Sequence, residues 1–187
     1  GNYFDIMRDR TAYGRAGIVT YDGWGVANYT VPNTNQTPQG VITGNVLKRM
    51  GRSETGSTLG AIDPYNFGMD ILIADNVVLD SYGRGIQFKA ECRKVSILNN
   101  IVDGLANGIG GLIAINSSPD YVGGGTLIIG GNICSNNPFG AGIICTGAGV
   151  EEGSGVTFQT RVTAVSIVNN IIKDVLGDAI DESFHQD

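Results

Sequence analysis

Carboxylates are the most frequent charged side chains in this sequence, since Asp and Glu number 18 against 12 Lys and Arg and a single His. Two carboxylates hydrolyse a glycosidic bond when they lie about 5 Å apart in retaining enzymes, or roughly 6.5–9.5 Å apart in inverting ones. Equivalent residues on neighbouring strands of a sheet are about 4.8 Å apart, and those on alternate strands about twice as far. Asp63, Glu91 and Asp181 each lie one to five residues beyond a Gly-Ile or Ala-Ile step, and we identify them as candidate catalytic acids. Asp63 and Asp181 are four repeats apart, so they cannot form one pair.

Aromatic and basic residues close to the same steps could hold a sugar polymer. Aromatic rings offer a broad apolar face with a polar edge, which suits stacking on sugar rings. Trp24 is the only Trp, and Tyr65 lies in the next aromatic-containing segment of this kind. Arg84 and Lys89 flank Ile86 and could pair with acidic groups. We identify Trp24, Tyr65, Arg84 and Lys89 as candidate substrate-binding residues, with the alternative that Trp24 only fastens its own loop to the body of the protein.

The other titratable residues favour structural roles. Asp80, Asp103 and Asp174 lie three or four residues beyond a repeated Asn, in polar segments where Asp is common turn chemistry. The three candidate acids could likewise be ordinary surface charges. The only histidine, His185, lies at the end of the sequence, which disfavours a Ser-His-Asp triad.

The cysteines indicate neither a disulfide framework nor a metal site. Cys92, Cys134 and Cys145 are odd in number and form no Cys-x-x-Cys pair, so we predict buried thiols that behave as small apolar side chains. A zinc site would need more soft ligands than the sequence groups together. No cluster of Asp and Glu marks a calcium site. We therefore assign no metal ligands to this chain.

An internal repeat must position the candidate residues. Each copy contains an Asn, an apolar β-branched residue, a polar turn, and then Gly or Ala before a second apolar segment. The repeated Asn residues are separated by 31, 24, 32 and 38 positions, and they are Asn45, Asn76, Asn100, Asn132 and Asn170. The second segments begin at Ile18, Ile62, Ile86, Ile109, Ile143 and Ile180. We count about six copies, of which the two nearest the start, Tyr3–Ile18 and Val41–Ile62, are the weakest.

Each position of the repeat has a physical role. Alternating apolar residues, as in Ser96-Ile97-Leu98, predict strands with one face inward. Asn at a fixed register tolerates the left-handed conformation of a turn, and stacked Asn side chains could also hydrogen-bond to one another as a ladder. Glycine before the second segment permits a sharp corner. The repeat therefore predicts an all-β, right-handed parallel β-helix of about six coils, a single domain over residues 1–187. Because neither end resembles a cap, we expect either a fragment of a longer β-helix or ends that partner chains cover.

Other folds fit the repeat less well. Rossmann folds and TIM barrels need helices of ten or more residues between strands, and no amphipathic helix of that length is visible. A β-sandwich would not repeat an Asn and a Gly-Ile step in one register. Leucine-rich repeats need a Leu framework that this sequence lacks.

Insertions follow the second segment of most copies and predict a groove. They span Tyr21–Gln39, Asp63–Met69, Asn116–Gly125 and Thr146–Arg161. Because they leave the repeat at one register, they should project from one side, and loops on a rigid scaffold often carry function. A wall of loops beside a flat strand face suits an extended polymer.

The charge of the chain disfavours two classes of partner. The formal net charge is −6, and no basic stripe is present, so binding to nucleic acid is disfavoured. An anionic membrane surface is disfavoured for the same reason, and no apolar run is long enough to span a bilayer.

The repeat resembles that of pectate lyases, alginate C5-epimerases and phage tailspike depolymerases, over nearly the whole chain. This resemblance implies a polysaccharide partner, degradation by hydrolysis or elimination, an extracellular or virion-associated location, and assembly as a homotrimer. It implies no cofactor other than Ca²⁺, which pectate-lyase-like proteins use.

One short segment also resembles the active-site stretch of the epimerases, in which Asp, Pro, His and Glu follow one another. Asp63 and Pro64 match the first two, whereas Tyr65 stands in place of the catalytic His and Asn66 in place of the acid. Two alternatives to a depolymerase stay open. The chain could be a non-catalytic structural or adhesive protein of a virion or cell surface, or a uronate C5-epimerase or lyase.

Overall fold

The computed structural model of this chain describes residues 2–5, 18–21, 39–54, 57–65, 69–89, 92–105, 111–116, 125–146 and 162–183. Strands and turns make up this part of the chain, and it contains no helix. A helix able to cross a membrane is accordingly not found in it. The prediction of an all-β protein with parallel strands is confirmed.

Three parallel sheets contain all but two of the described strands. Sheet A consists of β1 (Tyr3–Asp5), β4 (Val46–Lys48), β9 (Val77–Ser81), β12 (Ile101–Leu105), β15 (Ile133–Asn137) and β18 (Ile171–Val175). Sheet B consists of β2 (Ile18–Tyr21), β7 (Ile62–Tyr65), β10 (Ile86–Lys89), β13 (Ile113–Asn116), β16 (Ile143–Thr146) and β19 (Ile180–Ser183). Sheet C consists of β3 (Gln39–Thr43), β8 (Met69–Ala74), β11 (Cys92–Leu98), β14 (Gly125–Gly130) and β17 (Val162–Val168).

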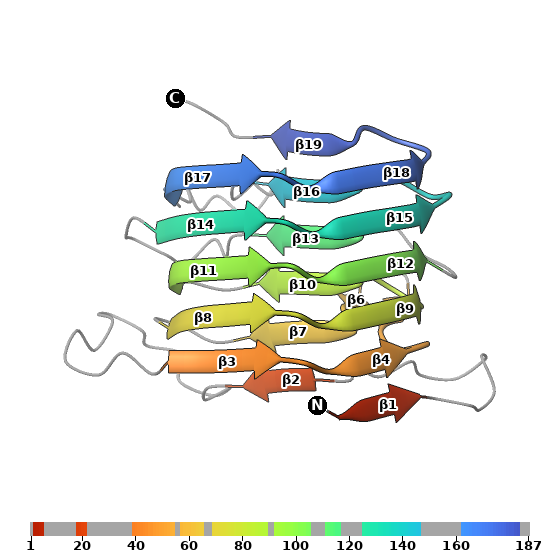
Figure 1. Cartoon of the computed structure of the whole chain (residues 1–187), viewed down its shortest axis with the longest axis horizontal. Helices are drawn as coiled ribbons and strands as arrows, with labels where there is room; N and C mark the ends of the chain where they lie inside the picture. The colour runs from red at the N-terminus through yellow and green to blue at the C-terminus, as the bar shows by residue number, and fades with distance from the viewer. Residues whose placement is uncertain are drawn as a thin grey trace.

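The chain visits the sheets in a fixed order, from C to A to B and back to C. On each return, the new strand pairs in parallel with the strand of the previous visit, so the sheets grow together in one direction (Figure 1). Equivalent residues therefore form rows that run across each sheet. One such row on sheet B is Ile86, Ile113 and Ile143.

A hairpin interrupts this order and was not predicted. Strands β5 (Arg52–Glu54) and β6 (Ser57–Leu59) pair antiparallel between β4 and β7. The hairpin accounts for part of the long separation between Asn45 and Asn76. That insertion therefore precedes the second segment of its copy, whereas the sequence predicted insertions only after it.

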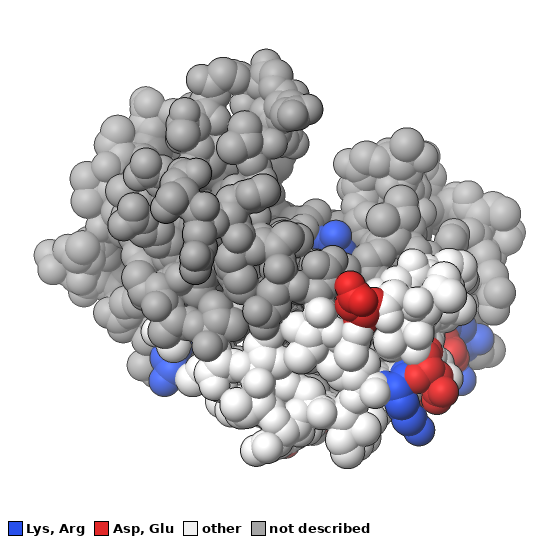
Figure 2. Space-filling model, turned by 90° about the horizontal axis from the view of Figure 1, so that it is seen from above, with Lys and Arg blue, Asp and Glu red and all other residues white. Residues whose placement is uncertain are grey.

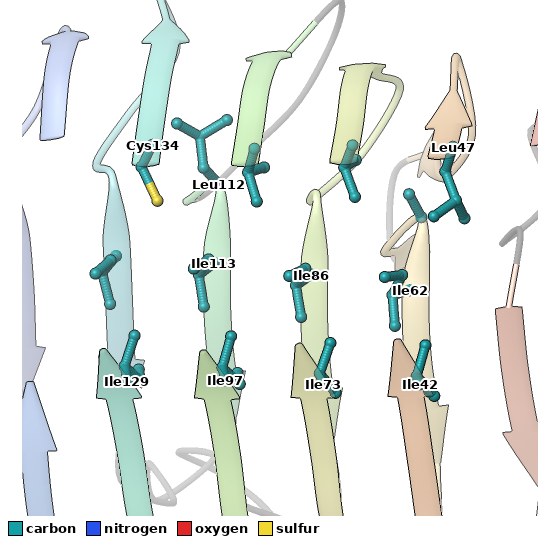
Figure 3. Packing of buried hydrophobic residues seen from close by; sticks show 14 of the residues in the cluster. Ile42, Leu47, Ile62, Ile73, Ile86, Ile97, Leu112, Ile113, Ile129 and Cys134 are labelled. Carbon is teal, nitrogen blue, oxygen red and sulfur yellow. The ribbon is translucent and has the colours of Figure 1, made fainter. Parts of the chain in front are cut away.

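The core consists of rows of isoleucine that stack between the sheets. Sheet C contributes the row Ile42, Ile73, Ile97 and Ile129, in which the most exposed member is only 7% exposed (Figure 3). Sheet B contributes Ile62, Ile86, Ile113 and Ile143, each with no exposed surface. Because side chains alternate along a strand, every second residue points into this core.

Two boundaries differ from the sequence prediction. Ile113 occupies the row of Ile86 and Ile143, whereas the repeat placed Ile109 there, and Ile109 lies outside the described residues. Asp63 lies within β7 and pairs with Val19, so it belongs to a strand and not to an insertion. Both errors have one cause: a Gly-Ile or polar-turn pattern is local, while row membership depends on the neighbouring strands.

The turn between sheets C and A contains a residue in the left-handed conformation at every visit. It is the residue before the repeated Asn, and these residues are Gly44, Asp75, Asn99, Gly131 and Asn169, with φ between 55° and 68°. The prediction that the repeated Asn itself adopts this conformation is therefore wrong. Asn, Asp and Gly occupy the preceding position because they tolerate positive φ with the least strain.

Candidate functional site

The repeated Asn residues have a structural role, so they are not part of the candidate site. Each donates from its backbone N–H and its Nδ2 to the Oδ1 of the next Asn, as in the 3.0 Å bonds from Asn76 to Asn100. A further bond runs from Nδ2 of Asn100 to the carbonyl of Ile73 at 3.0 Å. Asn76, Asn100 and Asn132 have no exposed surface. The predicted ladder is thus present, and its amides are satisfied within the protein.

Sheet B carries most of the predicted site residues that the structure describes. Asp63 and Tyr65 lie on β7, Lys89 ends the neighbouring strand β10, and Asp181 lies on β19. The paired residues Ile62 and Ile86 set the register of β7 against β10. The C-terminal ends of these two adjacent parallel strands therefore place the backbones of Tyr65 and Lys89 near each other.

Asp63 is a buried carboxylate at the start of β7. The side chain of its neighbour Ile62 points into the core, so the side chain of Asp63 leaves the strand on the opposite face. It is only 1% exposed. Its Oδ2 accepts a hydrogen bond from the backbone N–H of Gly60 at 3.2 Å. A buried carboxylate is costly unless it is hydrogen-bonded and paired with a positive charge, so its surroundings indicate a specific function or a specific structural need.

Gly60 fits this arrangement because the neighbouring strand leaves no room for a side chain. A Cβ on Gly60 would lie 2.8 Å from the backbone N of Gln87. Gln87, on β10, also has no exposed surface. The close approach of Gly60 to β10 therefore places its N–H where Asp63 can accept from it.

Arg84 supplies the positive charge near Asp63. Burial lowers the pKa of the Arg84 guanidinium, and the negative charge of Asp63 acts in the opposite direction and raises it. The backbone of Arg84 is held by the hydroxyl of Ser81, which donates to its carbonyl at 2.8 Å, and by the N–H of Ala61, which donates to the same carbonyl at 2.9 Å. These bonds fasten Arg84 beside the strand that carries Asp63.

One atom of the Arg84 side chain is buried, whereas the residue as a whole is partly exposed to solvent. Its Nε is buried and has no hydrogen-bond partner among the described residues. The residue as a whole is nevertheless only partly buried, so other atoms carry exposed surface. A guanidinium in this state can still donate to a carboxylate or a hydroxyl group of a ligand.

The structure brings Asp63 and Arg84 together and leaves Asp181 apart. Asp63 and Asp181 lie on strands four steps apart in sheet B, which corresponds to about 19 Å at the usual strand spacing. This distance exceeds that between the two carboxylates of a glycosidase. Glu91 and Trp24 lie outside the described residues, as does His185.

Three further acids lie apart from Asp63, on the strands of sheet A. Asp80 and Asp174 adopt positive φ, at 50° and 54°, as the turn prediction implied. Asp103 accepts bonds of 2.6 Å from the hydroxyl of Ser135 and from Nδ2 of Asn136. These three acids lie on sheet A, on a different sheet from Asp63.

Sequence reasoning missed the proximity of Asp63 and Arg84, although the repeat contains the signal. Gly60 and Arg84 each lie two residues before the Ile that begins a strand of sheet B, so they occupy equivalent places in neighbouring copies. Aligning the copies would have placed Gly60 beside Arg84. The hydrogen bond from Gly60 to Asp63, which brings the carboxylate close to Arg84, is visible only in the structure.

Neither metal-binding nor reactive thiol chemistry is indicated by the described residues. They contain no group of three or more His, Cys, Asp or Glu side chains that could hold a metal ion. Cys134 is a free, buried cysteine with no exposed surface. Burial raises the pKa of its thiol to about 12. Its thiolate is accordingly scarce at neutral pH, which disfavours a role as a nucleophile.

Comparison with family models, with curated proteins and with solved structures finds no match to this chain.

Proposed function

We propose that this chain is a right-handed parallel β-helix of about six coils that binds and degrades an acidic polysaccharide along sheet B. The order of the sheets supports the fold, because each passage through C, A and B adds one strand to each. A strand that returns to its own sheet in parallel almost always makes a right-handed crossover. The observation that carries the function is the partly exposed Arg84, which lies beside the buried Asp63.

Arg84 is the residue that we expect to touch the polymer. Its guanidinium suits the carboxylate of a uronic acid or another acidic sugar substituent, because a guanidinium and a carboxylate form paired, charge-assisted hydrogen bonds. Tyr65 and Lys89, at the ends of β7 and β10, extend the same site along sheet B. A row of strand ends suits a polymer better than a small ligand, since equivalent positions recur about every 4.8 Å.

Asp63 has a positioning role in this proposal. It is too deeply buried to reach a polymer, but its charge favours the cationic form of Arg84. We assign the proton-transfer step to Glu91, which lies five residues beyond the start of β10. With an acidic sugar, elimination transfers the proton beside the carboxylate to Glu91, forms a carbon–carbon double bond and breaks the bond to the linking oxygen, which takes up a proton from water and leaves as a hydroxyl group. Hydrolysis would instead need a second carboxylate near Glu91.

The proposal is tested by incubating the chain with uronate, capsular and O-antigen polysaccharides, with and without Ca²⁺. Two readouts are needed: new reducing ends, which both reactions produce, and the ultraviolet absorbance of an unsaturated sugar, which only elimination produces. Arg84→Gln should lower the rate about 100-fold or more, whereas Lys94→Gln should leave it unchanged, because Lys94 is exposed on sheet C. Arg84→Lys, which keeps the charge but not the fork of donors, should fall between them.

Each outcome assigns one of the functions under consideration. Cleavage that needs Arg84 supports the depolymerase. A change in sugar configuration without cleavage would assign a uronate C5-epimerase. Binding that Arg84→Gln abolishes, with no reaction, would leave an adhesive protein. A folded chain that neither binds nor cleaves any of these polymers would contradict the proposal and favour a structural shaft, for which the turn positions of Asp80 and Asp174 provide the support.

A further inference from the structure

Phe139 is an exposed aromatic residue on a turn that buried hydrogen bonds hold in place. It lies between β15 and β16 and is 46% exposed, although Phe side chains are usually found in the core. Its backbone N–H donates to Oδ1 of Asn137 at 3.0 Å, and Nδ2 of the same Asn donates to the carbonyl of Ala141 at 2.7 Å. Asn137 has no exposed surface. One buried amide therefore spans the turn that carries Phe139.

Two residues of β15 fasten the start of the same turn. Ser135 and Asn136 both donate to Oδ1 of Asp103, on the neighbouring strand β12, each at 2.6 Å. Together with Asn137, three consecutive side chains hold the segment that leads to Phe139. Binding of a ligand to the ring would therefore cost little conformational entropy, because the backbone that carries the ring is already ordered.

The turn that carries Arg84 is held in an equivalent way. Ser81, which also has no exposed surface, donates to the carbonyl of Arg84, as Asn137 donates to that of Ala141. Arg84 and Ala141 occupy the same place in their copies, since each lies two residues before the Ile that begins a strand of sheet B. Ser81 and Asn137 therefore have the same structural role in two copies of the repeat.

The corresponding residues on the other long strands of sheet A are apolar. Leu105 on β12 pairs with Ser81, and Val175 on β18 pairs with Asn137. Leu105 belongs to the core, and Val175 packs against it. A polar residue at such a position gives up the burial energy of an apolar side chain and must be hydrogen-bonded. This substitution therefore indicates that the turns before β10 and β16 need a defined shape.

Arg84 and Phe139 lie before strands of sheet B that are two steps apart. Arg84 precedes β10 and Phe139 precedes β16, and β13 lies between these strands (Figure 1). Two strand spacings correspond to about 9.6 Å along the stack. A single sugar is too small to contact both residues, whereas an extended chain of sugars that runs across the strands can do so.

Charged side chains are sparse on the described surface seen from the β18 end, where uncharged residues predominate (Figure 2). An acidic polymer thus finds few ionic partners there besides Arg84, and it needs contacts of another kind. The apolar face of an aromatic ring can stack on the apolar face of a sugar ring. Phe139 presents such a ring on a turn that is already ordered.

From these observations we infer that Phe139 forms a sugar-stacking subsite for the same acidic polymer, two strands along the stack from Arg84. This role rests on the proposed function, and it implies that the polymer runs across the strands of sheet B. An acidic group of one sugar pairs with Arg84, and the ring of a more distant sugar stacks on Phe139. Short oligomers reach Arg84 alone, whereas long ones reach both residues.

Isothermal titration calorimetry with oligomers of galacturonic acid and of mannuronic acid, from dimers to octamers, tests this inference. For the unmodified chain, affinity should rise with oligomer length. Phe139→Ala should weaken the binding of octamers about tenfold, which is the contribution of a typical stacking contact, and should leave the binding of dimers unchanged. Arg84→Gln should weaken binding at every length.

Two control variants separate stacking from effects on the fold. Phe139→Tyr keeps an aromatic ring, so octamers should bind it as tightly as they bind the unmodified chain. Ile101→Ala removes another exposed apolar side chain, which is 39% exposed on β12 of sheet A, and it should leave binding unchanged at every length. Urea denaturation of all variants checks that they remain folded during the titrations.

The possible failures are distinguishable. Octamers that bind Phe139→Ala as tightly as the unmodified chain would overturn the subsite and leave the role of Arg84 intact. An equal loss for dimers and octamers in Phe139→Ala would also overturn the subsite, because the ring would then act on the site around Arg84. Oligomers that fail to bind the folded, unmodified chain, or that bind Arg84→Gln equally well, would overturn the proposed function and the subsite with it.

Discussion

At the scale of single residues, adjacent positions in one turn have opposite tasks. Asn99 and Asn100 are chemically identical, yet Asn99 is exposed with φ of 55°, and Asn100 is buried in the ladder. The first needs a backbone that tolerates positive φ, and the second needs an amide with two donors and an acceptor. Their substitutions should therefore have very different effects.

We predict that Asn100→Ala lowers the free energy of unfolding by about 3–5 kcal/mol. It removes the acceptor for the N–H and Nδ2 of Asn76 and the donor to the carbonyl of Ile73, and each buried group left without a partner costs about 1–3 kcal/mol. Asn99→Gly should change stability by less than about 0.5 kcal/mol, because glycine adopts positive φ readily. Urea denaturation of both variants measures the difference, and equal midpoints would argue against the ladder.

Cys134 allows a prediction about pH. Burial raises the pKa of its thiol from 9.0 to about 12, so at pH 8 the thiolate is about a thousandfold scarcer in the folded chain than in the unfolded one. Alkylation of Cys134, followed by mass spectrometry of its peptide, should be slower by at least that factor without urea than with it. Because the unfolded chain loses this proton first, stability should fall as the pH rises from about 9 toward 12. Rapid alkylation of the folded chain would show that Cys134 is accessible.

At the scale of the elements, close approach between neighbouring strands explains the glycines before sheet B better than the sharp corner that the sequence suggested. A Cβ on Gly85 would clash with Cγ1 of Val102 and lie 2.8 Å from the carbonyl oxygen of Leu112. Gly130, on β14, differs from it: a Cβ there would meet Leu98 at 3.4 Å, an ordinary contact. Neither glycine has a positive φ, so the two positions differ only in the room that they leave for a side chain.

This comparison yields a prediction for a matched pair of variants. Gly85→Ala should destabilise the chain by about 2–3 kcal/mol, because the side chain of Val102 and the backbone of Leu112 must move. Gly130→Ala should lie within about 0.5–1 kcal/mol of the unmodified chain and could increase its stability, since alanine restricts the unfolded state. Thermal unfolding followed by circular dichroism compares the two. A larger loss in Gly130→Ala would show that the strands approach differently.

At the scale of the whole molecule, position along the stack decides how much a core residue contributes. Ile97 and Ile167 belong to the same row of sheet C, yet Ile97 lies between two strands that cover it, and Ile167 lies on the last. Ile97 has no exposed surface, and Ile167 is partly buried. In a stack, each strand contacts only its neighbours, so an end residue has about half the contacts of a central one.

Ile97→Ala should therefore cost about 3–5 kcal/mol, whereas Ile167→Ala should cost about half as much. Denaturant unfolding of both variants under one set of conditions provides the comparison. Equal costs would indicate that the last strands are already covered.

The sequence by itself determined the parallel all-β organisation, the row of ladder Asn residues and most members of the isoleucine row of sheet B. These features follow from local alternation and from a repeat, both of which are visible in one dimension. The sequence could not choose between Ile109 and Ile113, because each follows a Gly-rich segment and only packing against Ile86 and Ile143 selects the second. Tertiary structure also decided the proximity of Asp63 to Arg84, since the two residues belong to different copies and their electrostatic interaction depends on burial. Periodicity specifies which residues share a row. The burial of Asp63 and its electrostatic interaction with Arg84, on which the proposed site depends, arise only when the rows pack.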